Sequence, residues 1–89
     1  MINQQVIIIN KLGLHTRAAA KLVAIAQQFA SKIQLTRNDQ TIDAKSIMGV
    51  ITLGATKGTK LDLIISGNDE AQALQALLDL IGKRFGEAE

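Results

Sequence analysis

The chain has no cysteine, proline, tryptophan or tyrosine among its 89 residues. Without cysteine, disulfides, thiolate nucleophiles and Cys-based zinc or iron–sulfur sites are excluded. A single histidine makes a His-based metal site unexpected as well, and no cofactor is implied. The two phenylalanines are the only aromatic residues, so the core must be built mainly from Ile, Leu, Val and Ala. Hydrophobic residues make up 47% of the chain, which favours a globular fold over disorder.

The chain also lacks a strong excess of either charge, since ten basic and eight acidic residues leave a net charge of +2. The basic residues are scattered and few aromatics are available for stacking on bases, so we expect no nucleic-acid partner. The N-terminal MINQQVIIIN lacks the basic and long apolar regions of a secretory signal, and no apolar run is long enough to span a membrane. We therefore expect one cytoplasmic domain over residues 1–89, without membrane association.

Hydrophobic patterning predicts elements in the order β-α-β-β-α-β-α. The predicted strands are 4–10, 31–37, 41–44 and 59–67, and the predicted helices are 16–29, 46–54 and 68–85. The first strand is apolar on both faces, which indicates a central or well-covered position. The short helix is the least clear, because Gly49 weakens it. Hairpin and crossover connections, with one apolar stripe on each helix, predict a two-layer α/β (α+β) sandwich.

Polar residues mark the expected helix starts. His15 or Thr16 is expected to cap the first helix and Ser46 the short one. Asp69 with Gln72 resembles a capping box for the last helix. The final GEAE is expected to fray.

The segment LGLHTR at 12–17 contains the only histidine, His15, between a predicted strand and a predicted helix start. Backbone N–H groups at such a position attract anions. Arg17 can bind a phosphate through two parallel N–H groups, and a neutral imidazole is a competent nucleophile. These residues favour a histidine that accepts a phosphoryl group; a capping histidine without chemistry is the alternative.

The segment that begins at Ser46 has two interpretations. A helix cap is the interpretation that the residues favour for Ser46, and regulatory phosphorylation is the alternative. Ile47, Met48, Val50 and Ile51 are all apolar, and a short helix cannot bury all of them. The exposed remainder would form an apolar patch suited to docking.

The segments KLGLHTRAAAKLV (11–23) and AKSIMGVITLGATKGTKLDLIISGNDEAQALQAL (44–77) resemble the HPr family, the histidine-containing phosphocarriers of the bacterial phosphoenolpyruvate-dependent phosphotransferase system. The likeness covers nearly the whole chain. It implies an open-faced β-sandwich, with a four-stranded antiparallel sheet and three helices on one face. It also implies a carrier, rather than a free-standing enzyme, that takes a phosphoryl group from phosphorylated enzyme I, whose donor is phosphoenolpyruvate, and passes it to a IIA protein or domain.

The resemblance also implies residue roles. His15 would accept the phosphoryl group, Arg17 would hold it, and Ser46 would be the regulatory serine, open to an HPr kinase/phosphorylase. The implied partner surface consists of Thr16, Arg17, Ala20, Ile47, Met48 and Ile51. No metal is implied, and we expect a monomer.

The chain departs from the family pattern at two places. Ala18 stands where the family usually has proline, which suits a first helical turn. Ala24 and Gly49 stand where many sugar-branch members carry lysine. Together with NKLGLH (10–15) and RND (37–39), this favours the proteobacterial or nitrogen-branch (NPr) type. Sugar uptake and nitrogen or metabolic regulation both stay open. So does a non-catalytic regulatory module that binds through Ser46 and the helix-start surface.

Overall fold

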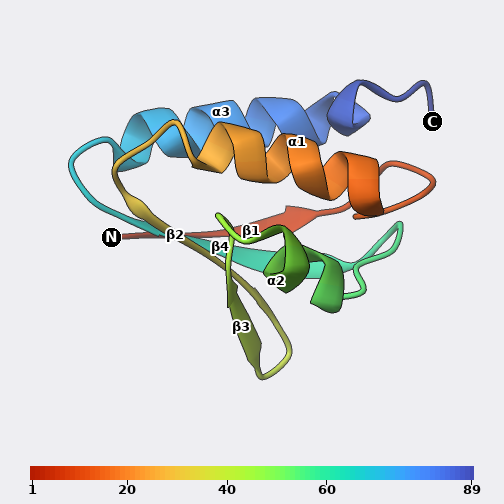
Figure 1. Ribbon diagram of the computed structural model, residues 1–89, viewed down its shortest axis with the longest axis horizontal. Coiled ribbons are helices and arrows are strands. Elements are labelled where there is room, and N and C mark those ends of the chain that lie inside the picture. The colour runs from red at the N-terminus through yellow and green to blue at the C-terminus, as the bar shows by residue number, and fades with distance from the viewer.

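The computed structural model describes residues 1–89 as a four-stranded sheet with a layer of helices (Figure 1). The strands are β1 (Ile2–Ile7), β2 (Lys32–Arg37), β3 (Gln40–Asp43) and β4 (Lys60–Ser66). The helices are α1 (Thr16–Ala26), α2 (Ile47–Thr52) and α3 (Glu70–Gly82), followed by a 3-10 turn, η1 (Arg84–Gly86). None of the helices has the length and apolar character needed to cross a membrane.

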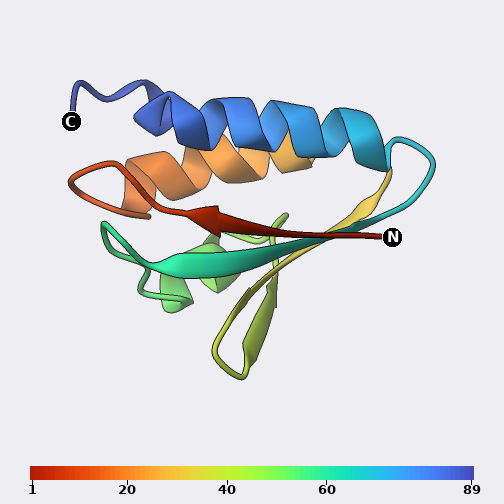
Figure 2. The ribbon, with the colours of Figure 1, turned by 180° about the vertical axis from the view of Figure 1, so that it is seen from behind.

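The strands lie in the order β1-β4-β2-β3, and every neighbouring pair is antiparallel. Helices α1 and α3 lie side by side over one face of the sheet in both the front and the back view (Figures 1 and 2). The predicted element order, the antiparallel sheet with helices on one face, and the hairpin of β2 and β3 are confirmed.

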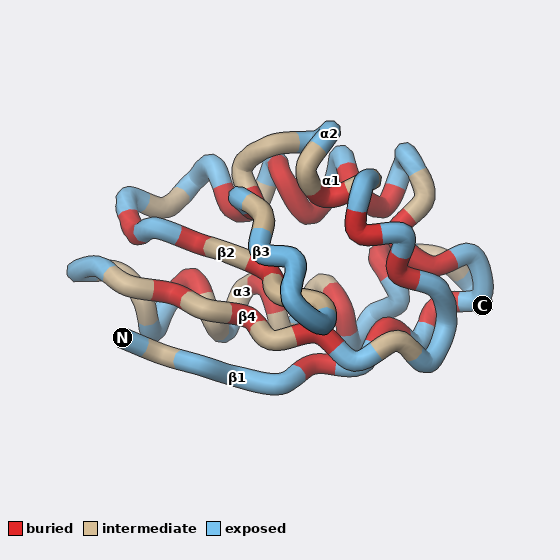
Figure 3. The backbone as a smooth tube through the Cα atoms, turned by 90° about the horizontal axis from the view of Figure 1, so that it is seen from below, coloured by how far each residue is buried: buried red, intermediate tan, exposed pale blue.

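The core lies between these two layers. Along β4, Leu61, Leu63 and Ile65 are buried and alternate with half-buried residues, as the sequence pattern predicts. Leu35 of β2 pairs with Leu63, so the two strands present their buried side chains to the same face. Figure 3 shows this alternation of buried and accessible positions along the strands. The buried apolar residues form one contiguous cluster, which includes Phe85 beyond α3.

The predicted central position of the first strand is wrong, because β1 is an edge strand that pairs with β4 alone. Val6 and Ile8 point into the core, whereas Ile7 and Ile9 are 45% and 37% exposed. The β-branched run therefore reflects strand propensity and not coverage of both faces. Regular pairing ends at Ile7, although Ile8 still donates to the carbonyl of Thr59 at 3.0 Å.

Both long helices are shorter than predicted, since α1 ends at Ala26 and α3 at Gly82. Phe29 and Phe85 nevertheless pack on the core from outside the helices. Hydrophobic spacing thus locates buried side chains here even after the helical backbone has ended.

Two cap predictions have different outcomes. Ser46 is the N-cap of α2, and its Oγ accepts the N–H of Gly49 at 3.1 Å. Asp69 precedes α3 but makes no cap hydrogen bond, so the predicted capping box is wrong. The Asp69 carboxylate accepts instead from the N–H groups of Ala30 (2.8 Å) and Ser31 (2.9 Å) and from the Ser31 hydroxyl. It thereby ties the loop after α1 to the start of α3.

Candidate phosphoryl-accepting site

His15 is the N-cap of α1, with extended backbone angles (φ −70°, ψ 174°) and no side-chain cap bond. Its carbonyl accepts the N–H of Ala19 at 2.8 Å, which is the first bond of the helix. Three backbone N–H groups lie between His15 and Ala19 and have no acceptor within the helix, namely those of Thr16, Arg17 and Ala18. His15, and not Thr16, therefore occupies the N-cap position of α1, without a side-chain cap bond, and it lies beside free backbone donors.

The loop before His15 is fixed by contacts at Gly13 and Leu14. Gly13 has φ +67°, and a Cβ there would collide with the carbonyl oxygen of Ala55. Leu14 is buried, and its N–H donates to the same Ala55 carbonyl at 2.9 Å. The side chain of Asn10 donates to the Gly13 carbonyl at 2.8 Å. These contacts set where the His15 backbone lies.

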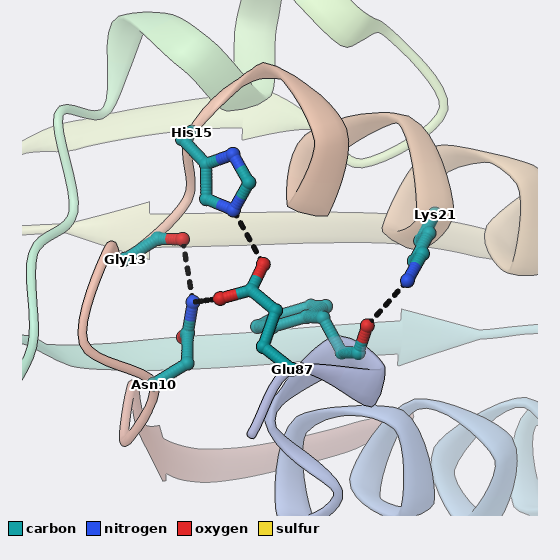
Figure 4. Close-up of polar contacts among 6 residues, drawn as sticks. Asn10, Gly13, His15, Lys21 and Glu87 are labelled. Carbon is teal, nitrogen blue, oxygen red and sulfur yellow. Dashed lines mark hydrogen bonds and ion pairs between the residues drawn. The ribbon is translucent and has the colours of Figure 1, made fainter. Parts of the chain in front are cut away.

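Glu87 contacts the ring of His15, as Figure 4 shows. The distance from His15 Nε2 to Glu87 Oε2 is 2.5 Å, and Glu87 Oε1 accepts from Asn10 Nδ2 at 3.1 Å. The hydrogen bond with His15, followed by that from Asn10, holds the pKa of the Glu87 carboxyl below its usual value of 4.5. The charges of His15 and Lys21 act in the same direction, and partial burial opposes them. Glu87 is therefore a carboxylate near neutral pH.

The expectation that the C-terminal segment frays is wrong. Phe85 is buried, and its carbonyl accepts from Lys21 Nζ at 2.6 Å. Glu89 accepts the backbone N–H of Lys11 at 2.5 Å and pairs with Lys11 Nζ at 3.3 Å. The sequence does contain a signal for this docking, because Phe85 continues the apolar stripe of the predicted last helix and lies only two residues before Glu87. Glu87 is a site residue that the sequence analysis missed.

Arg17 is exposed and makes no hydrogen bond or ion pair in the structure. With Lys11, Leu12 and residues 87–89 it lines an open hollow of about 380 Å³. Its guanidinium donors are thus free beside the start of α1. The structure therefore brings the two candidate residues, His15 and Arg17, to the same end of the helix.

The residues expected to contact partners lie on two helices that touch each other, α1 and α2. Thr16 and Ala20 are exposed on α1. On α2, Ile47 and Met48 are 43% and 69% exposed, and Ile51 is half-buried. The short helix does leave apolar side chains accessible, as the sequence analysis expects. Nothing in the structure groups three or more His, Cys, Asp or Glu side chains as metal ligands.

Comparisons with known proteins agree with this geometry. The family model described as "PTS HPr component phosphorylation site" matches residues 2–83. The chain is 51% identical over 89 residues to a phosphocarrier protein HPr of Neisseria meningitidis and to one of Cupriavidus necator, with full coverage of each chain. A solved structure of HPr-C-His from Thermoanaerobacter tengcongensis superposes with a TM-score of 0.96 at 42% identity, again over the whole of both chains.

Identity at this level over the full length, together with the matched fold, decides the family. The chain belongs to the HPr family of phosphocarrier proteins of the phosphotransferase system, which carry a phosphoryl group from enzyme I to a IIA protein.

Proposed function

We propose that His15 accepts the phosphoryl group, and that it does so on Nδ1. The observation that supports this is the orientation of the ring. Nε2 is held by the Glu87 carboxylate at 2.5 Å, while Nδ1 makes no hydrogen bond and is turned away from Glu87 (Figure 4). A carboxylate only accepts hydrogen bonds, so Nε2 carries the proton and Nδ1 of the neutral ring keeps its lone pair.

The transfer step follows from this arrangement. The Nδ1 lone pair attacks the phosphorus carried by enzyme I and an N–P bond forms. The bond between phosphorus and its donor group breaks, and that group keeps the electron pair. The phosphoryl oxygens then meet the free N–H groups at the start of α1 and the unpaired guanidinium of Arg17. The reverse chemistry, with a IIA side chain as the acceptor, unloads the carrier.

The test is intact-mass analysis after incubation with phosphoenolpyruvate, magnesium and enzyme I. The wild type is expected to gain one phosphoryl group, which acid removes, and His15→Ala is expected to gain none. Lys32→Ala serves as the control, since it changes an exposed residue of β2 that belongs neither to the acceptor site nor to the proposed docking surface. Phosphorylation that persists in His15→Ala would contradict the proposal.

We also propose that the exposed side chains of α1 and α2 dock both partners. The patch consists of Thr16, Arg17, Ala20, Ile47, Met48 and Ile51. Apolar side chains beside a cation suit protein partners that present an acidic rim around an apolar centre. Met48, the most exposed of the apolar members at 69%, adapts readily to more than one partner surface. Met48→Asp is expected to weaken binding to enzyme I in titration calorimetry while leaving the melting temperature unchanged.

Ser46 lies at the edge of this patch, and we propose that its phosphorylation reduces docking. Its Oγ already caps α2, so a phosphate would keep an acceptor at the helix start while adding negative charge next to Ile47. An HPr kinase/phosphorylase would be the modifying partner. Ser46→Asp is expected to retain the cap and slow transfer from enzyme I; an unchanged rate would contradict this role.

We assign the protein to the cytoplasm as a monomer, because a carrier of this kind must diffuse between two protein partners. Transfer of the phosphoryl group to purified IIA proteins of the sugar and nitrogen branches identifies the branch.

A regulatory binding module without phosphotransfer is the alternative, and the exposed Ile47 and Met48 are the observation that favours it. Absence of transfer combined with tight protein binding would decide for that alternative.

A further inference from the structure

We propose that Glu87, held by Asn10, is a positioning residue for His15 that also balances the positive charge of the phosphorylated ring. The inference rests on the proposed function, because it concerns the histidine that accepts the phosphoryl group. The C-terminal segment would thus supply the negative charge beside the His15 ring. Residues close to His15 in the sequence do not supply it.

The geometry is a relay of three side chains. Asn10 is fully buried, and its Nδ2 bridges the Gly13 carbonyl (2.8 Å) and Glu87 Oε1 (3.1 Å). The other oxygen of the Glu87 carboxylate lies 2.5 Å from His15 Nε2. The His15 and Glu87 side chains are only 26% and 16% exposed, so water screens their contact incompletely. A buried amide thus orients a carboxylate, and the carboxylate orients the imidazole.

The backbone before Glu87 is held in an uncommon conformation. Arg84 and Phe85 have φ values of 55° and 56°, in the left-handed region that residues other than glycine rarely adopt. Such strain persists only where surrounding contacts fix it. Here the buried Phe85 ring and the bond from Lys21 Nζ to the Phe85 carbonyl provide those contacts. The reversal after α3 is therefore well anchored, and it delivers Glu87 to His15.

Charge explains what the carboxylate does during transfer. When Nδ1 forms its bond to phosphorus, the proton stays on Nε2 and the ring becomes a cation. Glu87 lies against that N–H and is the negative charge nearest to it. A hydrogen bond of this charge-assisted kind is stronger than one between neutral groups. Glu87 therefore stabilises the phosphorylated state more than the free state, while Lys11 and Lys21 balance the tail carboxylates.

The test compares Glu87→Gln and Glu87→Ala with Glu89→Gln. The control removes the same charge from the same segment, at a residue whose hydrogen bond and ion pair are both with Lys11. Each protein is equilibrated with phosphorylated enzyme I, and the phosphorylated fraction and the initial rate are measured. Both Glu87 variants are expected to shift the equilibrium toward the donor by about tenfold, as loss of a hydrogen bond to a charged group typically does. The control is expected to match the wild type.

A second readout separates positioning from folding. In ¹⁵N spectra recorded without enzyme I, the Nε2 proton of His15 is expected to exchange faster with water in Glu87→Ala than in Glu89→Gln, at equal melting temperatures. Equal equilibria and equal proton exchange in the Glu87 variants and the control would overturn the inference and leave the proposed function intact. A wild type that accepts no phosphoryl group would overturn both.

Discussion

The two ring nitrogens of His15 have different surroundings, and this difference supports its assignment as a directional acceptor. Nε2 meets a carboxylate from the C-terminal segment, whereas Nδ1 is free of hydrogen bonds. The lone pair that we propose for the attack on phosphorus is thus on a different ring nitrogen from the proton. The role that we propose for Arg17 is different, since its guanidinium has no ion-pair partner in the structure and stays available to an incoming anion.

Replacement of Arg17 by alanine tests this division of roles. Because Arg17 makes no internal contact, Arg17→Ala is expected to leave the melting temperature unchanged. The loss of charge-assisted hydrogen bonds is expected to slow transfer from enzyme I at least about tenfold. The rate of phosphoryl transfer is measured in quenched time courses read out by intact mass. Lys32→Ala is the control, at an exposed cation on the sheet. Equal rates for the two variants would contradict the role of Arg17.

Gly13 offers a second test at this scale. Gly13→Ala is expected to destabilise the protein by more than about 1 kcal/mol, because alanine strains a left-handed backbone and its Cβ would collide with the Ala55 carbonyl. It should also slow phosphorylation by displacing the loop that sets His15.

Gly58→Ala is the matched control for this prediction, since Gly58 has φ +90° with nothing within 4 Å of an added Cβ. Urea unfolding should show a smaller loss for Gly58→Ala, and its transfer rate should stay normal. A larger loss at Gly58 than at Gly13 would show that the contact with Ala55 has little importance.

Among the elements, those with strong local patterns are the ones that the sequence predicts well. The alternation of Leu61, Leu63 and Ile65 identifies β4 and its buried face, because the period of two is a property of the strand itself. The edge position of β1 depends on which strands become its neighbours, and its Ile-rich sequence carries no information about that. Asp69 is similar, since its carboxylate can cap α3 or accept from Ala30 and Ser31, and only the folded chain decides.

The hydrogen bonds of Asp69 make the free energy of unfolding depend on pH in the acid range. The hydrogen bond from the Ser31 hydroxyl, with those from the Ala30 and Ser31 backbone, lowers the pKa of the Asp69 carboxyl from 3.8. Because the pKa of this carboxyl is lower in the folded state than in the unfolded state, its ionisation stabilises the fold. That stabilisation is fully present above the unfolded-state pKa and is lost as the pH falls through the folded-state pKa. The free energy of unfolding should therefore fall more steeply below pH 3.8 in the wild type than in Asp69→Asn.

Urea unfolding at a series of acid pH values measures this slope. Asp39→Asn is the control, because Asp39 is an exposed turn residue whose side chain makes no hydrogen bond. Parallel curves for the wild type and Asp69→Asn would show that the link between α3 and the loop after α1 does not depend on the ionised carboxylate.

For the whole molecule, the two-layer arrangement brings two regions that are distant in the sequence to one end. The loop after β1, the start of α1 and the segment after α3 meet there, as the front and back views both show (Figures 1 and 2). His15 and Glu87 are separated by 72 positions in the sequence. The motif LGLHTR therefore predicts the acceptor and Arg17, whereas the partner of Nε2 becomes visible only in the fold.

Phe85 connects the core to this end of the molecule. Phe85→Ala is expected to lower the free energy of unfolding by about 3–5 kcal/mol, because a fully buried aromatic side chain is removed. It should also release Glu87 from His15, which changes the ring ¹⁵N shifts. Phe29→Ala, at a partly buried ring away from the C-terminal segment, should cost less and leave those shifts unchanged. Unchanged His15 shifts in Phe85→Ala would contradict this coupling.

We propose above that the phosphoryl group resides on Nδ1 of His15 while Nε2 keeps its proton. The most direct measurement is the one-bond coupling between ³¹P and ¹⁵N in protein labelled at histidine and phosphorylated by enzyme I with phosphoenolpyruvate. We expect one phosphorus coupled to Nδ1, in a ring whose Nε2 is protonated. Coupling to Nε2, or a phosphorylated protein without any coupling to the His15 ring, would contradict it.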